Sequence, residues 1–159
     1  MEQTVEPQTQ RGGGFEPARV RQFTVFLDNR VGRLQTLLSV LESAAHPIRA
    51  LSIEESGETA LVRLICADAD AARQILRDGG FPFGELDLLA VQIPKRNPQP
   101  LIAICSVLLS AEINIHYVYP FLVGPRGPAL ALYAEDPVLA EQLLIRKGFT
   151  LIGESDLKA

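Results

Sequence analysis

The residues best suited to chemistry lie in one short segment, residues 28–34, with the sequence DNRVGRL. It follows an alternating apolar stretch and precedes a helical pattern. The first turn of a helix leaves backbone N–H groups without partners and carries partial positive charge, so it can bind a carboxylate. Asn29 offers a donor and an acceptor, Asp28 offers an anion, and Gly32 allows close approach to the backbone. The segment therefore predicts a site for a carboxylate beside an ammonium group, as in a free amino acid.

The other reactive side chains favour structural roles. Asp68, Asp70 and Asp136 lie at expected helix starts, where a carboxylate caps the helix. Nucleophile motifs of the Ser-His-Asp or Cys-His type are missing from the sequence. The histidines and cysteines also lack metal-ligand spacing, namely His46, His116, Cys66 and Cys105. We therefore predict no catalytic residue, no metal site and no cofactor, and thus a protein that is not an enzyme.

The elements that position this segment are duplicated along the chain. At an offset of about 67 to 69 residues the two halves align, which is the signature of an internal repeat. In the first part of the repeat, the matched residues are Leu34, Ser39, Val40, Leu41, Ser43, Ala44 and Ile48 with Leu101, Ser106, Val107, Leu108, Ser110, Ala111 and Ile115. In the second part, they are Leu64, Asp68, Ala72, Gln74, Leu76, Gly80 and Phe81 with Leu132, Asp136, Ala140, Gln142, Leu144, Gly148 and Phe149.

Each half has the pattern β-α-β-β-α-β. In the first half we expect strands at 21–27, 48–55, 59–66 and from 85, with helices after Gly32 and Asp68. In the second half we expect strands at 89–93, 115–122, 129–134 and 150–153, with helices over 101–108 and after Asp136. The predicted fold is α+β: two ferredoxin-like units in tandem, with antiparallel sheets covered by helices on one face. We expect a flexible tail over 1–19 and units at 20–88 and 89–159.

Composition limits the classes of function. The chain has 159 residues, 47% of them hydrophobic, and a formal net charge of −4. Its basic residues are scattered, which argues against a nucleic-acid partner, and no apolar run reaches the length that crosses a bilayer. Two cysteines in apolar stretches suggest buried, reduced thiols. Because the start of the chain lacks the pattern of a signal peptide, we expect a cytoplasmic protein without a membrane partner.

The pattern Asp28-Asn29-x-x-Gly32-x-Leu34 resembles the ligand loop of the ACT domain family. Residues 48–53 and 114–119 resemble second strands of that family, and 21–157 as a whole resembles stand-alone tandem ACT proteins. The resemblance implies a non-catalytic sensor for allosteric regulation in amino-acid metabolism, with an amino acid held between two units. One wall would be formed by Asp28, Asn29, Val31, Gly32, Arg33 and Leu34. The opposing wall would come from Ile48, or from Asn114 and Ile115 of the other unit.

The second loop departs from this pattern. In residues 94–101, Gln99 stands where glycine is expected, and Pro98 and Pro100 remove backbone donors. We therefore expect one site per chain, on the first loop. Asn29 and Gly32 could also serve as turn residues only, because turns favour both types.

Three functions remain as alternatives at this stage. The first is a stand-alone amino-acid sensor, which we expect to be a homodimer. The second is the regulatory small subunit of a metabolic enzyme such as acetolactate synthase, whose small subunits resemble this chain in their N-terminal ACT domain. The third is a small enzyme on a ferredoxin-like scaffold. The sequence leaves it undecided whether the units pair within one chain or between two chains.

Overall fold

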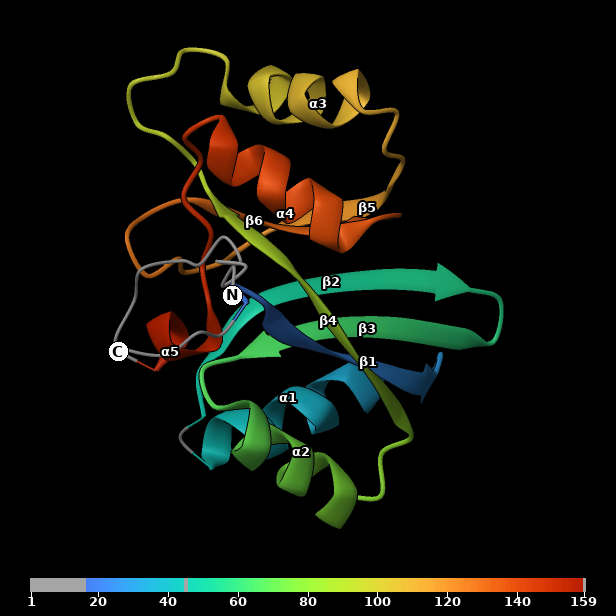
Figure 1. Cartoon of the computed structure of the whole chain (residues 1–159). Coiled ribbons are helices and arrows are strands. Elements are labelled where there is room, and N and C mark those ends of the chain that lie inside the picture. The colour runs from blue at the N-terminus through green and yellow to red at the C-terminus, as the bar shows by residue number, and fades with distance from the viewer. Residues whose placement is uncertain (1–16, 45, 159) are drawn as a thin grey trace, which may run out of the picture.

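A computed structural model describes residues 17–44 and 46–158 of the chain (Figure 1). The first unit contains β1 (Val20–Asp28), α1 (Arg33–Ser43), β2 (Ile48–Ser56), β3 (Thr59–Cys66), α2 (Ala69–Asp78) and the first part of β4 (Phe83–Gln92). The second unit contains the rest of β4, α3 (Pro100–Ser110), β5 (Ile115–Pro120), β6 (Ala129–Ala134), α4 (Pro137–Arg146) and α5 (Glu154–Leu157). The predicted order of elements is thus present in both units up to the last strand.

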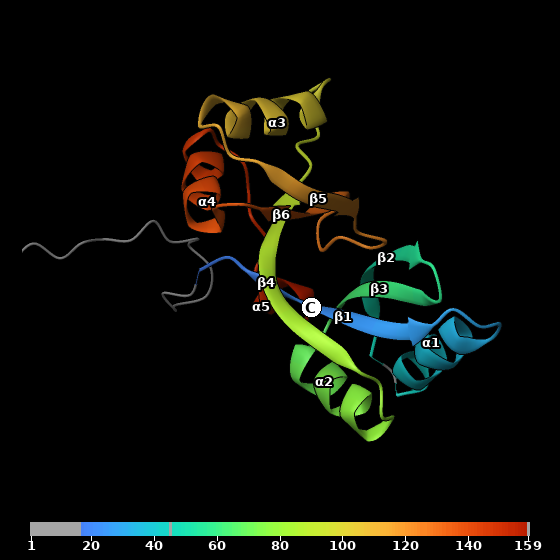
Figure 2. The same cartoon turned by 90° about the vertical axis from the view of Figure 1, so that its right-hand side faces the viewer.

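A single long strand, β4, joins the two units. The sheet has the order β2-β3-β1-β4-β6-β5, and all neighbouring strands are antiparallel. The first part of β4 pairs with β1 as far as Leu88, opposite Val20, and the second part pairs with β6 from Leu89, opposite Leu132. The partner therefore changes at the boundary that we propose between the units. Figure 2 shows β4 curving from the lower unit into the upper one.

Helices cover the outer face of each half of the sheet. In Figure 1, α1 and α2 lie below the first unit's strands, and α3 and α4 lie above those of the second. The first core gathers Phe23, Leu37 and Leu64 under α1 and α2. The second gathers Leu89, Ile104 and Leu132 under α3 and α4. Each unit thus buries one face of its strands against its own helices.

The remaining inner faces pack against each other within one chain. This third core is formed by Val20, Ala50, Ile65, Leu88, Ala90, Tyr119, Phe121, Ala129, Ala131, Ile152 and Leu157. On the side opposite β4, an antiparallel bridge joins Ala50 to Phe121, and the N–H of Leu122 donates to the carbonyl of Arg49 over 2.8 Å. The units are therefore held together face to face, with strand contacts at both sides of the interface.

Local capping agrees with the sequence at two helices. The side chain of Asp68 accepts from the N–H of Ala71 at the start of α2, and Asp136 accepts from Leu139 at the start of α4. Within the described ranges, no helix is long and apolar enough to cross a membrane.

The expected strand over 150–153 is wrong in extent. Only an isolated bridge between Val91 and Leu151 forms, flanked by hydrogen bonds from Gln92 N to Thr150 O and from Ile152 N to Ala90 O. The strand cannot continue because Gly153 is the N-cap of α5. Its N–H donates to the Asp156 side chain within that helix and is not available for strand pairing. The short helix carries Leu157 into the core between the sheets.

Two further expectations need correction. Ala18 and Arg19 were predicted to belong to the tail, but Ala18 is buried and both residues contact the Glu141 side chain in α4. The rest of the predicted tail lies outside the described residues, except for Pro17. Cys66 is buried as expected, whereas Cys105 is exposed. The exposure of Cys105 could not be predicted from the sequence of α3, because nearly all residues of this helix are apolar, including those that face solvent.

Candidate functional site

The β1–α1 loop ends in a helix start that no side chain caps. Gly32 is the N-cap of α1 and has a φ of 86°, in the left-handed region that favours glycine. Its carbonyl accepts from both the N–H and the hydroxyl of Thr36, which begins the helix. Because glycine offers no side-chain acceptor, the first-turn N–H groups at Leu34 and Gln35 are available to an anion.

The loop is fastened to the β2–β3 hairpin of its own unit by Asn29. The backbone N–H of Asn29 donates to Glu58 O over 2.8 Å, and its side-chain amide donates to Glu55 Oε1 over 2.6 Å and to Gly57 O over 3.2 Å. The amide donors of Asn29 are therefore used within the protein, which gives this residue a structural role. Its Oδ1 and the nearby Glu55 carboxylate remain as groups that can accept from an ammonium.

Positive charge lies on both sides of the helix start. Arg30 forms an ion pair of 2.7 Å with Asp28, where both side chains are largely exposed. The Arg33 guanidinium lies 5.9 Å from the centre of the Phe81 ring, and its buried Nε has no hydrogen-bond partner in the described structure. Val31 projects fully into solvent. The loop thus offers a carboxylate the N–H groups of α1 and one incompletely bonded arginine.

The opposing wall expected from the sequence is not next to this loop within the chain. Asp28 pairs with Thr59 at one end of β3, while Ile48 pairs with Cys66 at the other end. The two ends are seven residue steps apart along β3, roughly 23 Å at about 3.3 Å per residue. The fold therefore brings residues 28–34 together but leaves Ile48 remote from them.

The alternative wall, Asn114 and Ile115, belongs to the second unit. Ile115 pairs with Ala134, and the carbonyl of Asn114 accepts from Glu135 at the junction of β6 and α4. Figure 2 places the start of β5 close to α3 and α4, on the other side of the molecule from the β1–α1 loop. Within one chain, neither candidate second strand faces the first loop.

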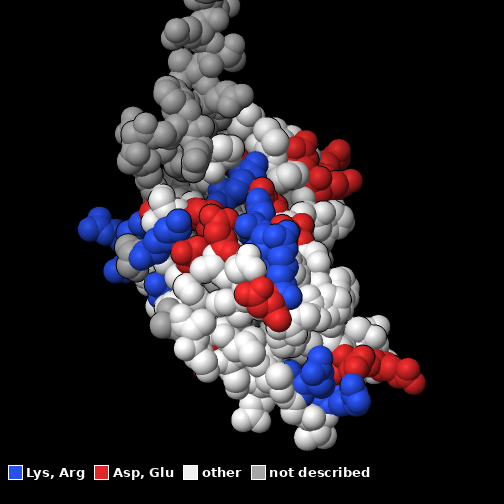
Figure 3. Space-filling model, turned by 90° about the horizontal axis from the view of Figure 1, so that it is seen from below, with Lys and Arg blue, Asp and Glu red and all other residues white. Residues whose placement is uncertain are grey.

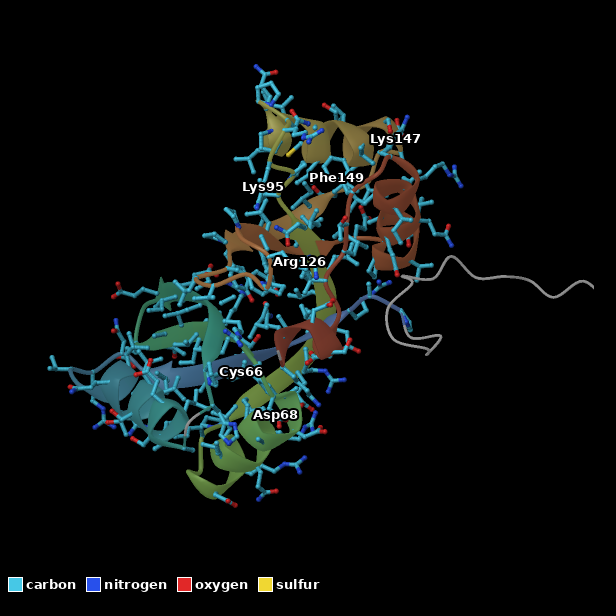
Figure 4. The ribbon with its side chains drawn as sticks, turned by 90° about the vertical axis from the view of Figure 1, so that its left-hand side faces the viewer. Cys66, Asp68, Lys95, Arg126, Lys147 and Phe149 are labelled. Carbon is cyan, nitrogen blue, oxygen red and sulfur yellow. The ribbon has the colours of Figure 1, made fainter. Side chains whose placement is uncertain are left out.

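The second loop borders a cavity that sequence reasoning missed. The cavity has a volume of about 380 Å³ and is lined by Gln92, Pro94, Arg96, Asn97, Lys147, Gly148, Phe149 and Thr150. Asn97 Oδ1 accepts from the N–H of Gln99, so this loop is held by its own side chain. Figure 4 shows Lys95, Lys147 and Phe149 at this end of the second unit. The sequence feature that could have pointed to this cavity is the repeat match of Phe81 with Phe149, because each residue follows the second helix of its unit.

These features agree with a comparison against known families. A family model described as an ACT domain pair matches residues 18–159. The chain belongs to the ACT domain pair family. A search of curated proteins found no match.

Solved structures share the fold of this chain. Protein BT0572 from Bacteroides thetaiotaomicron is 25% identical, with a TM-score of 0.79, and the match covers 89% of this chain and 96% of that one. The regulatory subunit of aspartate kinase from Thermus thermophilus is 10% identical, with a TM-score of 0.57 and coverage of 82% and 93%. The same subunit from Thermus flavus is 11% identical, with a TM-score of 0.53 and the same coverage. The two kinase subunits show likeness of fold alone.

A charged network on the first ACT unit is internally paired. The Arg73 side chain contacts Asp70 at 2.8 Å and Glu85 at 2.5 Å, and Arg21 Nε lies 2.6 Å from Asp87. The hydrogen bond from Arg73 lowers the pKa of the exposed Asp70 carboxyl. Figure 3 shows side chains of both signs intermingled on this face. Such mutual pairing is typical of a structural surface network and leaves little charge for a ligand.

Burial affects one carboxylate beside this network. Glu154, at the start of α5, accepts from the N–H of Arg21. Its burial raises its pKa, partly offset by that hydrogen bond. Cys66 and Asp68 lie in the same region of the first unit (Figure 4), and burial raises the pKa of the Cys66 thiol to about 12. A thiol with so high a pKa is a poor nucleophile at neutral pH.

Proposed function

We propose that this ACT pair is a non-catalytic regulatory protein that binds a free amino acid at the β1–α1 loop. The observation that carries the proposal is the start of α1, where Gly32 leaves the first-turn N–H groups uncapped and the Arg33 guanidinium follows directly. Both groups are suited to a carboxylate. Membership of the ACT family and the regulatory subunits that share its fold support the same role.

Each end of an α-amino acid finds a complementary group here. The carboxylate would accept from the N–H groups of Leu34 and Gln35 and from Arg33. The ammonium would donate to the Glu55 carboxylate, which Asn29 holds at 2.6 Å beside the loop. Glu55 is therefore a candidate that residue patterns in the loop alone did not suggest, since it lies on β2 and reaches the loop only through the hairpin.

The second wall would come from another chain. Ile48 lies at the far end of its own β2, and Asn114 and Ile115 lie away from the loop, so a ligand that contacts both walls needs a second copy. This supports a homodimer with the loop of one chain facing a second strand of its partner. Ligand binding would then stabilise the dimer, because a ligand that bridges two chains favours their association.

A thermal-shift screen of the twenty amino acids on the full chain tests the proposal. A specific ligand should raise the melting temperature in a concentration-dependent way. Calorimetry should then give one site per chain. Arg33→Ala should weaken binding by at least about tenfold, as expected for loss of a charged hydrogen bond. Asn97→Ala, in the second loop, is the control and should bind normally.

The outcomes separate the parts of the proposal. If no amino acid shifts the transition, the binding function is wrong. If Asn97→Ala weakens binding as much as Arg33→Ala, the site lies on the second loop instead. If two equal sites per chain appear, the expected asymmetry between the loops is wrong.

A second candidate keeps the binding and adds an enzyme partner. It is the regulatory subunit of an amino-acid biosynthetic enzyme such as acetolactate synthase. The observation in its favour is the apolar outer surface of α3, where Leu101, Ile102 and Leu109 are 56%, 61% and 75% exposed. Exposed apolar patches mark interaction sites. Affinity purification of the tagged chain from its native source should recover a large catalytic chain if this role is correct, and only the chain itself if it is not.

A further inference from the structure

The second unit contains a deep apolar cavity under α3. Its volume is about 450 Å³, and its lining residues are Val91, Leu101, Ile104, Cys105, Ile115, Val118, Tyr119, Pro120, Leu130 and Leu132. The floor is formed by buried side chains such as Val91, Ile104 and Leu132. The rim is formed by exposed residues of α3 and β5, among them Leu101 and Val118. The cavity therefore runs from the surface into the core of the unit.

The first unit shows why this space exists. Strand registers match the two units: Leu51 lies opposite Leu64, and Val118 lies opposite Leu132. The helices match through Leu34 and Leu101 in the repeat, which places Cys105 at the position of Leu38. Leu38 and Leu51 pack onto the first core, whereas their counterparts are the smaller Cys105 and Val118, both on the cavity wall.

A second difference lies deeper in the core. In the first unit, Phe23 and Phe83 make an edge-to-face contact with ring centres 5.8 Å apart. Phe23 pairs with Leu64, and Leu89 pairs with the matching Leu132, so leucine replaces the first ring. If Leu89 corresponds to Phe23, then Val91 corresponds to Val25, two residues further along the strand. Phe83 lies opposite Val25 and Leu151 lies opposite Val91, so Leu151 replaces Phe83. The second core is thus built from smaller side chains on the same frame.

The lining restricts the chemistry of an occupant. None of its residues is charged, and the Tyr119 hydroxyl already donates to Gln22 over 2.6 Å. Water would find few hydrogen-bond partners in such a space, and apolar cavities of smaller size are known to stay dry and bind benzene. A charged group inside would lose its hydration without a counterion. The volume also falls within the range of small-molecule sites.

We propose that this cavity is a second ligand site, separate from the β1–α1 loop, which binds a small uncharged apolar molecule such as a single aromatic or branched aliphatic group. A protein partner fits less well, since the cavity lies within one unit, between α3 and its own strands, and its floor is buried core. Tyr119 also lies on the wall, and its hydroxyl bonds Gln22 of β1 on the other face of β5, so the occupant would pack against the strand that links the two units.

Indole is a suitable probe, and the full wild-type chain is titrated with it by calorimetry and by NMR. Saturable binding of one indole per chain is expected. Cys105→Leu and Val118→Leu, which restore the first unit's residues, should each weaken binding, and the double variant should weaken it at least tenfold. Leu109→Ala, on the exposed side of α3 and outside the lining, is the matched control and should bind as the wild type does. Asn29→Ala should also leave indole binding unchanged, so failure of the loop site is distinguished from failure of this one.

A readout on the wild-type protein covers the case in which a variant does not fold. Cys105 is exposed at the rim while Cys66 is buried. Saturating indole should therefore slow alkylation of Cys105 at least tenfold. Absence of saturable binding, unchanged alkylation, or full affinity in the double variant overturns the proposal. Light scattering that shows the double variant to be monomeric, with a dimeric wild type, would also overturn it, because the cavity would then receive a second copy of the chain.

Discussion

The hydroxyl of Tyr119 in β5 donates a hydrogen bond of 2.6 Å to Oε1 of Gln22 in β1, across the interface between the two ACT units. Gln22 is fully buried, and its side-chain amide donates to the Tyr117 hydroxyl over 2.8 Å. The Arg63 guanidinium lies over the Tyr117 ring at 4.1 Å. A buried amide is costly without partners, so this cluster favours one alignment of the two units over others.

Tyr119→Phe should lower the free energy of unfolding by about 1–3 kcal/mol, because Gln22 Oε1 would remain buried without a donor. Urea denaturation followed by circular dichroism measures the change. Tyr133→Phe is the control, since its hydroxyl makes no hydrogen bond in the described structure and only its ring contacts His116 and Tyr117. Equal losses in both variants would contradict the role given to the Gln22 pair.

Gly32→Ala should destabilise the protein by about 1–2 kcal/mol, the cost of a left-handed backbone for a residue with a Cβ. The φ of 86° causes this cost, because a Cβ at Gly32 would meet no atom within 4 Å. Gly84→Ala is the control: it too has free space around its Cβ position, but its φ lies outside the left-handed region. Thermal unfolding of both variants tests the difference, and a loss at Gly84 as large as that at Gly32 would argue against backbone strain.

Alkylation of the native protein should modify Cys105 and spare Cys66. Cys105 is exposed, whereas burial raises the pKa of the Cys66 thiol to about 12 and shields it from the reagent. Mass spectrometry of peptides after brief exposure to iodoacetamide measures the modification at each site. In denaturant both cysteines should react at similar rates. Native labelling of Cys66 would show that the first unit's core opens readily.

Glu154→Gln should change how stability depends on pH. Burial raises the pKa of Glu154 above its ordinary value of 4.5, so the folded protein binds this proton more tightly than the unfolded chain does. The contribution of Glu154 to the stability of the folded protein is therefore most favourable below pH 4.5. It is lost as pH rises through the raised pKa. Glutamine can still accept from the N–H of Arg21 but does not ionise.

The stability of Glu154→Gln relative to the wild type should therefore improve as pH rises from 4 to 7. Unfolding free energies at several pH values give this difference. Glu135→Gln, at an exposed glutamate, serves as the control and should show a flat difference. A flat difference for Glu154→Gln as well would mean that burial does not raise the pKa of Glu154.

Much of the fold could be predicted because it depends on nearby residues. Asp68 and Asp136 cap helices through N–H groups three residues away, and the hydrophobic periods of strands and helices are read within one element. The repeat then supplied the order of elements in the second unit. The loop 28–34 was likewise recognisable as a helix start, since its chemistry comes from the backbone of α1.

Other features depended on contacts between distant residues. Three of them are the exposure of Cys105, the cavity beside it, and the hydrogen bond from Asn29 to Glu55. Each can be predicted only when the positions of separate elements in space are known. The sequence by itself determined two ACT units and the helix start that could receive a carboxylate, because local backbone geometry and periodicity are enough for both. Only the tertiary structure decided that the units meet face to face through a shared β4, and that Ile48 lies remote from the loop. Both results follow from strand register and packing, because a shift of one residue in the register changes which side chains meet.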